Sequence, residues 1–361
     1  MKILTKYLLA RYLRVFFVIL VSLEFFFVGI DFFQKYKSIP SSANLQVLYI
    51  LYNGFFTLTL ALPLSLIFAW IACLVSFIKS NEHVAFLSLG ISYKNIIKPI
   101  VLISCSLLFV LIALQSTPLA YSFNQKNKIL DRHYFSDVKE DIFLKYNNYF
   151  VYFEKLYPNQ KRATGILIYR LNTDKNDVMQ TIIAKKAHFQ NDRWYIEDAK
   201  VITKPQIRDW KSAKLKVSHK DFLYTLEGFK PKILDNVYKN ESNLSILDAV
   251  YALSLFHEQG VNTAKIRGSL YFQIIIAFFI IPLIFLIYSF ASVNSRFFSS
   301  GIFVSSSILL TLIVWGIFFI LNRLSSGGFA SPELMLLLPM LVFLVISYLF
   351  YKKNTSFKNA S

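Results

Sequence analysis

Long apolar runs occupy the two ends of the chain and are missing from its middle. Six of these runs reach the length of roughly 20 residues that a helix needs to cross a bilayer. The second run is long enough to tilt or to extend past the bilayer, and Pro63 is expected to kink it. The pattern predicts six transmembrane helices, at 15–33, 48–78, 96–117, 270–290, 301–321 and 334–351.

The middle of the chain has a different pattern. Apolar and polar residues alternate there with the period of two that is typical of half-buried strands, at 150–157, 165–172, 193–203 and 214–226. Turn-prone residues separate these segments, which indicates one β domain, a sandwich or a jelly roll. A helical pattern resumes at 245–258, where Ser245 is a candidate N-cap and Asp248 falls in the first turn.

These patterns define the expected fold class: a polytopic α-helical membrane protein with six transmembrane helices and an inserted, jelly-roll-like β domain. We expect spans one to three in residues 1–117, the β domain in 118–265 and spans four to six in 266–361. Hydrophobic residues make up 55% of the chain, which is too apolar for a soluble protein of this size.

The distribution of positive charge predicts the orientation. Cations beside the spans gather on one side, whose short segments hold Lys2, Lys6, Arg11, Arg14, Lys79, Lys94, Lys98, Arg296, Lys352, Lys353 and Lys358. The short loops of the other side hold only Lys35, Lys37 and Arg323. The positive-inside rule therefore predicts that both termini and residues 80–99 are cytoplasmic and that the β domain is extracytoplasmic. The first run is expected to be a retained helix and not a cleaved signal peptide, because the nearest small-residue cleavage candidate lies far beyond its apolar core.

Several kinds of chemistry have no motif in the sequence. No GxxxxGK[ST] or HExxH is present, so the chain is expected to bind neither nucleotide nor catalytic zinc, and no cofactor is predicted. Cys73 and Cys105 both fall inside predicted spans, which favours small buried side chains over a disulfide. The net charge of +18 is spread over membrane flanks and the strand-rich region, so membrane topology explains it better than nucleic acid.

A short apolar segment follows the second span. Ser80 is a candidate N-cap, Glu82 falls in the first turn and Gly90 offers a left-handed terminus. Such a short helix is unstable alone in water, so it must be buried, either at the lipid headgroups or in a groove of a cytoplasmic partner. Glu82 is the single acid in the cytoplasmic segments, and this favours the partner.

The span plan and the segment after span two resemble those of a known family. The six-span plan and the run SNEHVAFLSLGIS resemble the LptF/LptG permeases, which extract lipopolysaccharide from the inner membrane of Gram-negative bacteria. Glu82, Gly90 and Ser92 hold the places of the family pattern after span two, while His83 departs from it. The similarity continues in KYLLARYLRVFF, NYFVYFEKLYP, GILIYRLNTD, AKKAHFQNDRWYIEDA and GGFASPELMLLLP, and the β-domain segments look closer to the LptG branch.

The resemblance implies a permease subunit without its own ATPase. Two such permeases pair, a cytoplasmic ABC ATPase dimer binds ATP and Mg²⁺, and lipopolysaccharide passes to a periplasmic bridge protein with similar β domains. Residues 80–91 would be the coupling helix, with Glu82 pairing with a basic residue of the ATPase. The expected coupling residues are Glu82, Val84, Phe86, Leu87 and Gly90.

An extractor of an anionic lipid needs cations near the outer leaflet. Lys35, Lys37, Lys128, Arg132 and Arg323 are candidates for this role, and each can also be an ordinary snorkelling or loop cation. Glu24 and Asp31 are added to the candidate set because carboxylates within a span are costly. For Glu24 a structural hydrogen bond within the bundle is the favoured alternative.

The β domain carries a further candidate surface. Five of its residues are expected to point inward and either to line a slot for acyl chains or, as favoured, to form an ordinary core: Phe150, Tyr152, Ile166, Ile168 and Trp194. Two other functions stay open for the whole chain. It could be a sensor or scaffold that binds a periplasmic ligand without transport, or an intramembrane enzyme, for which the catalytic constellations are missing.

Overall fold

The computed structural model describes residues 2–131, 138–146, 148–158, 160–171, 177–205, 215–229, 244–257, 263–291, 296, 298–327 and 329–360. The chain forms two compact units. The helical unit comprises Met1–Leu130, Asn243–Ala249 and Ala264–Ser361, and the sheet unit comprises Asp131–Ser242 and Val250–Thr263. The helical unit thus continues to Leu130, beyond the expected limit at residue 117.

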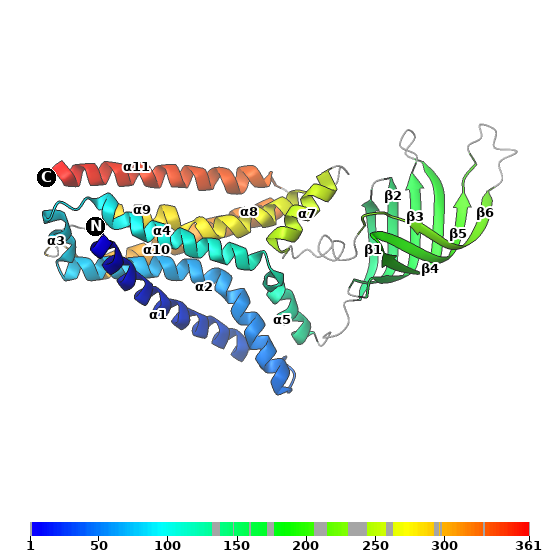
Figure 1. Ribbon diagram of the computed structural model, residues 1–361, viewed down its shortest axis with the longest axis horizontal. Coiled ribbons are helices and arrows are strands. Elements are labelled where there is room, and N and C mark those ends of the chain that lie inside the picture. The colour runs from blue at the N-terminus through cyan, green and yellow to red at the C-terminus, as the bar shows by residue number, and fades with distance from the viewer. Residues whose placement is uncertain are drawn as a thin grey trace. The chain divides into compact units, whose positions relative to one another are not determined.

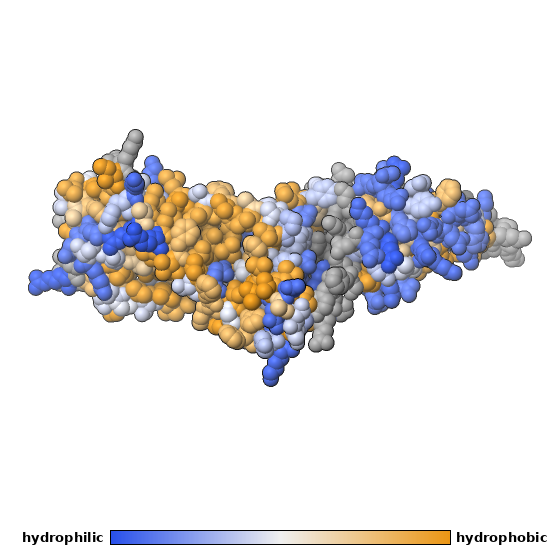
Figure 2. Space-filling view, turned by 60° about the horizontal axis from the view of Figure 1, so that its bottom comes forward, coloured by the Kyte–Doolittle hydropathy of each residue, from blue (hydrophilic) through white to orange (hydrophobic). Residues whose placement is uncertain are grey.

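Six helices of the helical unit are long and apolar enough to cross a membrane, as the apolar runs predict. They are α1 (Lys2–Lys35), α2 (Ala43–Lys79), α4 (Tyr93–Gln115), α8 and α9 (Ala264–Phe278 and Ile280–Phe290), α10 (Ser300–Ser326), and the π-helical turn η3 with α11 (Glu333–Leu337 and Leu338–Ala360). Apolar residues cover the surface of this unit in Figure 2, as the faces of a membrane-spanning bundle require.

The helix α2 forms the centre of the bundle. Of the most apolar 18-residue stretch of α2, 67% is buried inside the unit, whereas only 6% of the corresponding stretch of α1 is buried. Trp70 is fully buried and its indole N–H donates to the carbonyl oxygen of Ile284 on α9 at 3.3 Å. Pro63 lies within α2, which bends along its length (Figure 1). In contrast, α1 lies at the edge of the unit, packed against α2 and α4.

Four shorter helices are described besides the spans, and the last of them is divided between the two units. The helix α3 (Glu82–Ser88) connects α2 and α4 and lies at the same end of the unit as both chain termini (Figure 1). We call this end the α3 end. The helices η1 (Pro118–Tyr121) and α5 (Ser122–Leu130) follow α4. The helix α7 (Ile246–His257) begins as predicted, because Ser245 Oγ accepts from the Asp248 backbone N–H at 3.1 Å.

The sheet unit is one antiparallel sheet of six described strands paired in chain order, so the inserted β domain is confirmed. The predicted strands correspond to β2 (Tyr149–Tyr157), β3 (Arg162–Leu171), β5 (Arg193–Thr203) and β6 (Lys216–Thr225). The strands β1 (Lys139–Tyr146) and β4 (Val178–Gln190) were not predicted. Doublets such as Ile182-Ile183 and Lys185-Lys186 interrupt the alternation in β4.

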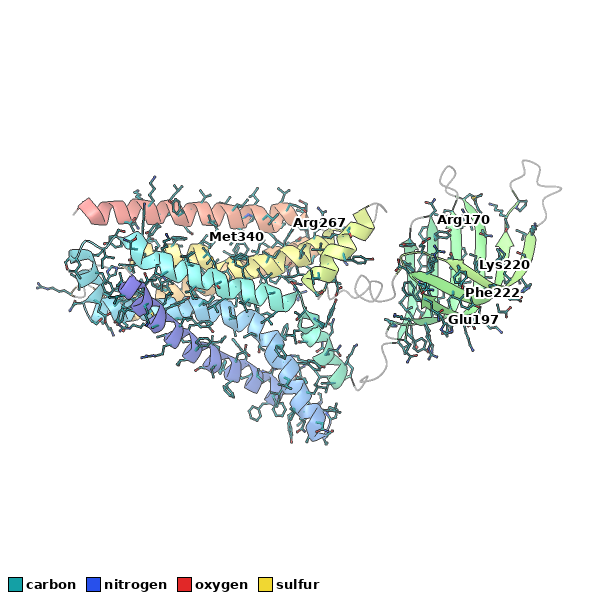
Figure 3. All side chains as sticks on the ribbon, viewed as in Figure 1. Arg170, Glu197, Lys220, Phe222, Arg267 and Met340 are labelled. Carbon is teal, nitrogen blue, oxygen red and sulfur yellow. The ribbon has the colours of Figure 1, made fainter. Side chains whose placement is uncertain are left out.

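The sheet curves (Figure 1), and one of its faces carries the core of the unit. Trp194 and Phe153 are fully buried there, and the Trp194 indole donates to the Phe229 carbonyl at 2.7 Å. Ile166 and Ile168 belong to this core as expected. The opposite face carries polar and aromatic residues, including the register partners Glu197 and Phe222 (Figure 3).

The expected inward direction of Phe150 and Tyr152 is wrong. Their neighbours Val151 and Phe153 are buried instead, and successive side chains of a strand point to opposite faces. Phe150 stacks on Phe143 of β1, which is half exposed, with ring centroids 5.6 Å apart. The strand carries apolar side chains on both faces, so the alternation alone does not identify the core face.

Candidate functional site

The short helix α3 has a defined start and end. Asn81 precedes it in the left-handed region (φ 59°), so the prediction of Ser80 as N-cap is wrong. Ser80 Oγ donates instead to the Ser76 carbonyl oxygen and to Glu82 Oε1, at 2.8 and 2.7 Å. Gly90 is left-handed (φ 76°) as predicted, and the backbone N–H groups of Gly90 and Ile91 bond back to Leu87 and Phe86. This is the Schellman end that glycine favours.

Glu82 is the centre of a cluster that joins α1, α2 and α3. Arg11 Nη1 lies 2.7 Å from Glu82 Oε1 and 2.8 Å from Oε2, and the Tyr7 hydroxyl donates to Oε2 at 2.7 Å. Arg11 Nη2 also donates to Ser76 Oγ at 2.6 Å, and the guanidinium lies over the Phe77 ring. The sequence predicted a partner for Glu82 on another protein, whereas the structure provides one within the chain.

The environment of Glu82 keeps it ionised. Burial raises the pKa of this carboxyl, but hydrogen bonds from Arg11, Ser80 and Tyr7 outweigh burial and hold the pKa below its ordinary value. About a quarter of each side chain of the ion pair is exposed. Half-buried, multiply bonded charges of this kind fix the geometry of the elements that carry them.

The two sides of α3 differ in what they contact. His83 is buried, with Nε2 3.3 Å from the Tyr288 hydroxyl of α9 and its ring 5.9 Å from that of Tyr93. Phe86 and Leu87 pack against the core of the helical unit. Val84 and Leu89 are exposed, Leu89 by 77%. Of the expected apolar coupling residues, the structure therefore turns Phe86 and Leu87 toward the bundle and Val84 outward.

A second cluster joins α1, α2 and α5 and includes a cation that the sequence analysis missed. Lys126 is 5% exposed, and its ammonium group donates to Asn53 Oδ1 at 2.8 Å and to Asp31 Oδ2 at 3.1 Å. The Tyr49 hydroxyl donates to the same Asp31 oxygen at 2.5 Å. The Phe56 ring lies 5.3 Å from the ammonium. A carboxylate in a span needs a partner, and Asp31 was therefore the one signal in the sequence for a cation beside it.

Glu24 lies between the two clusters, on α1. Its Oε2 accepts from the Thr57 hydroxyl of α2 at 2.6 Å, while Oε1 is buried without a partner among the described residues. The favoured expectation of a hydrogen bond within the bundle fits this contact.

The remaining candidate cations lie at several places. Lys35 and Lys37 are exposed at the end of α1 and just after it. Arg323 is exposed on α10 with its guanidinium 5.5 Å from the Phe319 ring centre, and Lys128 on α5 is half-buried. Arg132 lies outside the described residues.

A further ion pair, also missed, connects α8 to the start of the last span. Arg267 Nη1 (Figure 3) donates to Glu333 Oε1 of η3 at 2.5 Å, and the Tyr271 hydroxyl donates to the same oxygen at 3.3 Å.

The fold and these clusters define a multi-pass membrane protein with an inserted antiparallel sheet domain and a short, charge-anchored helix between its second and third spans. The family model described as "Lipopolysaccharide export system permease LptF/LptG" matches residues 6–353. The chain therefore belongs to the LptF/LptG family, the membrane permease subunits of lipopolysaccharide export, and the match does not distinguish the LptG branch from LptF. No curated protein matches the chain.

Proposed function

We propose that this chain is a permease subunit of an ATP-driven ABC-type exporter that extracts lipopolysaccharide from the bacterial inner membrane. ATP and Mg²⁺ would bind to a separate cytoplasmic ATPase dimer, and this chain would carry no cofactor. The observation that carries the proposal is the Arg11–Glu82 ion pair, because it ties α3 to α1. A movement imposed on α3 would reach the most exposed span of the bundle.

The exposed side of α3 supports its role as the coupling helix. Val84 and Leu89 are exposed apolar residues, and a partner seated on α3 would bury them. Glu82 and Gly90 act within the chain on this reading, since they set the start and the end of α3. Phe86 and Leu87 seat the helix on the bundle.

The proposed orientation puts the α3 end in the cytoplasm and the sheet unit in the periplasm. Exposed cations at the α3 end support this, among them Lys94, Lys98 and Lys353. Both described chain ends lie there as well (Figure 1). The sheet unit would then pass lipopolysaccharide to a periplasmic bridge protein with a similar β domain.

The lipid path in this proposal uses cations at the opposite end of the bundle. Lys35, Lys37, Lys128 and Arg323 would contact the phosphates of lipid A, and a second LptF/LptG-type permease would complete the cavity. Arg132, outside the described residues, is a further candidate on the sequence alone. Asp31 and Glu24 would act differently, because Lys126 and Thr57 engage their carboxylates within the bundle. We assign them a positioning role for α1.

Copurification from native membranes tests the proposal. A P-loop ATPase is expected to copurify with the wild-type chain in mild detergent and to be depleted by Leu89→Asp, which charges the exposed side of α3. Ser299→Asp adds the same charge at an exposed position before α10 and should leave the ATPase bound. Absence of any ATPase in several mild detergents would contradict the coupling role and favour a membrane-anchored sensor or scaffold.

A further inference from the structure

A groove of about 520 Å³ lies between α1 and α4 near the α3 end. Leu4 and Leu9 of α1 form one wall, and Leu102 and Ile103 of α4 form the other. Its volume falls within the range of small-ligand pockets. Both walls belong to the helical unit.

The groove has Asn95 and Lys98 at one end, together with Ile91, and mainly apolar side chains at the other end, where Ser106 is the exception. Asn95 and Lys98 line it within the first two turns of α4, and Leu102 and Ile103 line it one to two turns further on. From Asn95 to Ser106, the last lining residue, α4 rises by about 16 Å at the usual 1.5 Å per residue. The polar end lies where the span begins, so the groove has the polarity of a bilayer leaflet.

Two features of the polar end suit an anionic headgroup that also accepts and donates hydrogen bonds. Lys98 is exposed, and among the described residues no carboxylate pairs with it. Pro99 has no N–H, so it removes the helical donor of the Asn95 carbonyl and leaves an acceptor at the groove. Glu82, the acid of neighbouring α3, is already engaged by Arg11.

We propose that this groove binds a membrane phospholipid with an anionic headgroup. The phosphate contacts the Lys98 ammonium group, and an acyl chain lies along Leu9, Leu102 and Ile103. The ligand is distinct from the transported lipid, because a groove of this size takes one slender chain and lies at the α3 end. Ile91, three residues after the end of α3, also lines the groove, so a bound lipid braces α1 and α4 beside the coupling helix.

Native mass spectrometry of the purified full-length chain, with the partners that copurify with it, tests the site. Added phosphatidylglycerol is expected to be retained in preference to phosphatidylcholine. Lys98→Gln should lower the retained phosphatidylglycerol roughly three- to tenfold, the loss of a partly exposed charge contact. Lys94→Gln is the matched control, because Lys94 is an exposed lysine one turn away that does not line the groove, and it should retain the lipid.

A photoactivatable phosphatidylglycerol locates the lipid independently. Its crosslinks are expected on peptides of α1 and α4, and Ser106→Phe, which fills the apolar end, should reduce them. Equal losses in Lys94→Gln and Lys98→Gln would overturn the proposal, and so would crosslinks confined to other helices. Displacement by lipopolysaccharide or by inorganic phosphate at concentrations that match the phospholipid would also overturn it, by assigning the groove to another ligand. None of these outcomes depends on whether an ATPase copurifies.

Discussion

Each of the four carboxylates outside residues 118–265 has a partner on another helix. An unpartnered carboxylate in or beside a bilayer is costly, so these contacts are fixed points between helices. Three of them are ion pairs, and their cations lie 71, 95 and 66 positions away in the sequence. The pairs are Glu24–Thr57, Asp31–Lys126, Glu82–Arg11 and Glu333–Arg267.

Removing the Arg11 charge should loosen α3. In Arg11→Gln the Glu82 carboxylate keeps only Tyr7 and Ser80, and we expect a loss of about 1–2 kcal/mol in the free energy of unfolding. Arg14→Gln, at an exposed position of the same helix, should change it by less than about 0.5 kcal/mol. A double-mutant cycle of Arg11→Gln with Glu82→Gln, followed by chemical unfolding in detergent, measures the coupling. Additive effects would show that the pair contributes nothing.

The same pair predicts a pH dependence. The pKa of Glu82 is lower in the folded chain than its ordinary value of 4.5, so the stabilisation is fully present above pH 4.5. It is lost as the pH falls through the lowered pKa. The difference in melting temperature between the wild type and Glu82→Gln should therefore be constant from pH 7 to pH 5 and shrink below pH 4.5. A difference that grows on acidification would contradict this sign.

At the scale of elements, the sequence predicted the helices and strands that depend on local patterns of apolar and polar residues. Apolar length identified every span, and period-two alternation identified β2, β3, β5 and β6. The missed features depend on distant partners or on irregular patterns. Lys126 looks like a solvated cation of a polar segment until Asp31 and Asn53 are brought beside it, and the register of β2 decides that Val151 is buried while Phe150 is not.

The Lys126 cluster should hold α5 against the α1–α2 pair. Lys126→Met leaves the Asp31 carboxylate without its cation, and we expect a loss of about 2–3 kcal/mol, because breaking a buried pair strands the remaining charge. Lys35→Met, at an exposed lysine one turn beyond Asp31, should have a much smaller effect. Chemical unfolding in detergent measures both, and the double variant Lys126→Met/Asp31→Asn should regain part of the loss. If Lys126→Met and Lys35→Met were equally mild, the cluster would not be a structural clamp.

At the scale of the whole molecule, two units with different surfaces share one chain. Figure 2 shows hydrophobic residues over the helical unit and hydrophilic residues over the sheet unit. A continuous apolar surface is stable in lipid, whereas the charged outer side of a sheet requires water. The sheet unit therefore lies outside the bilayer, and the side on which it lies is a matter of charge distribution along the chain.

Labelling with a membrane-impermeant maleimide in spheroplasts tests on which side of the membrane the sheet unit lies. With Cys73 and Cys105 replaced by alanine, single cysteines at Lys220 in β6 and at Ser41 in the loop before α2 should react while the membrane is intact. A cysteine at Ser88 on α3 should react only after the membrane is opened, because the cations of the α3 end resist translocation. All three positions are exposed, so burial does not explain a difference between them. Reaction of Ser88→Cys with the membrane intact would reverse the orientation and remove α3 from the reach of any cytoplasmic ATPase.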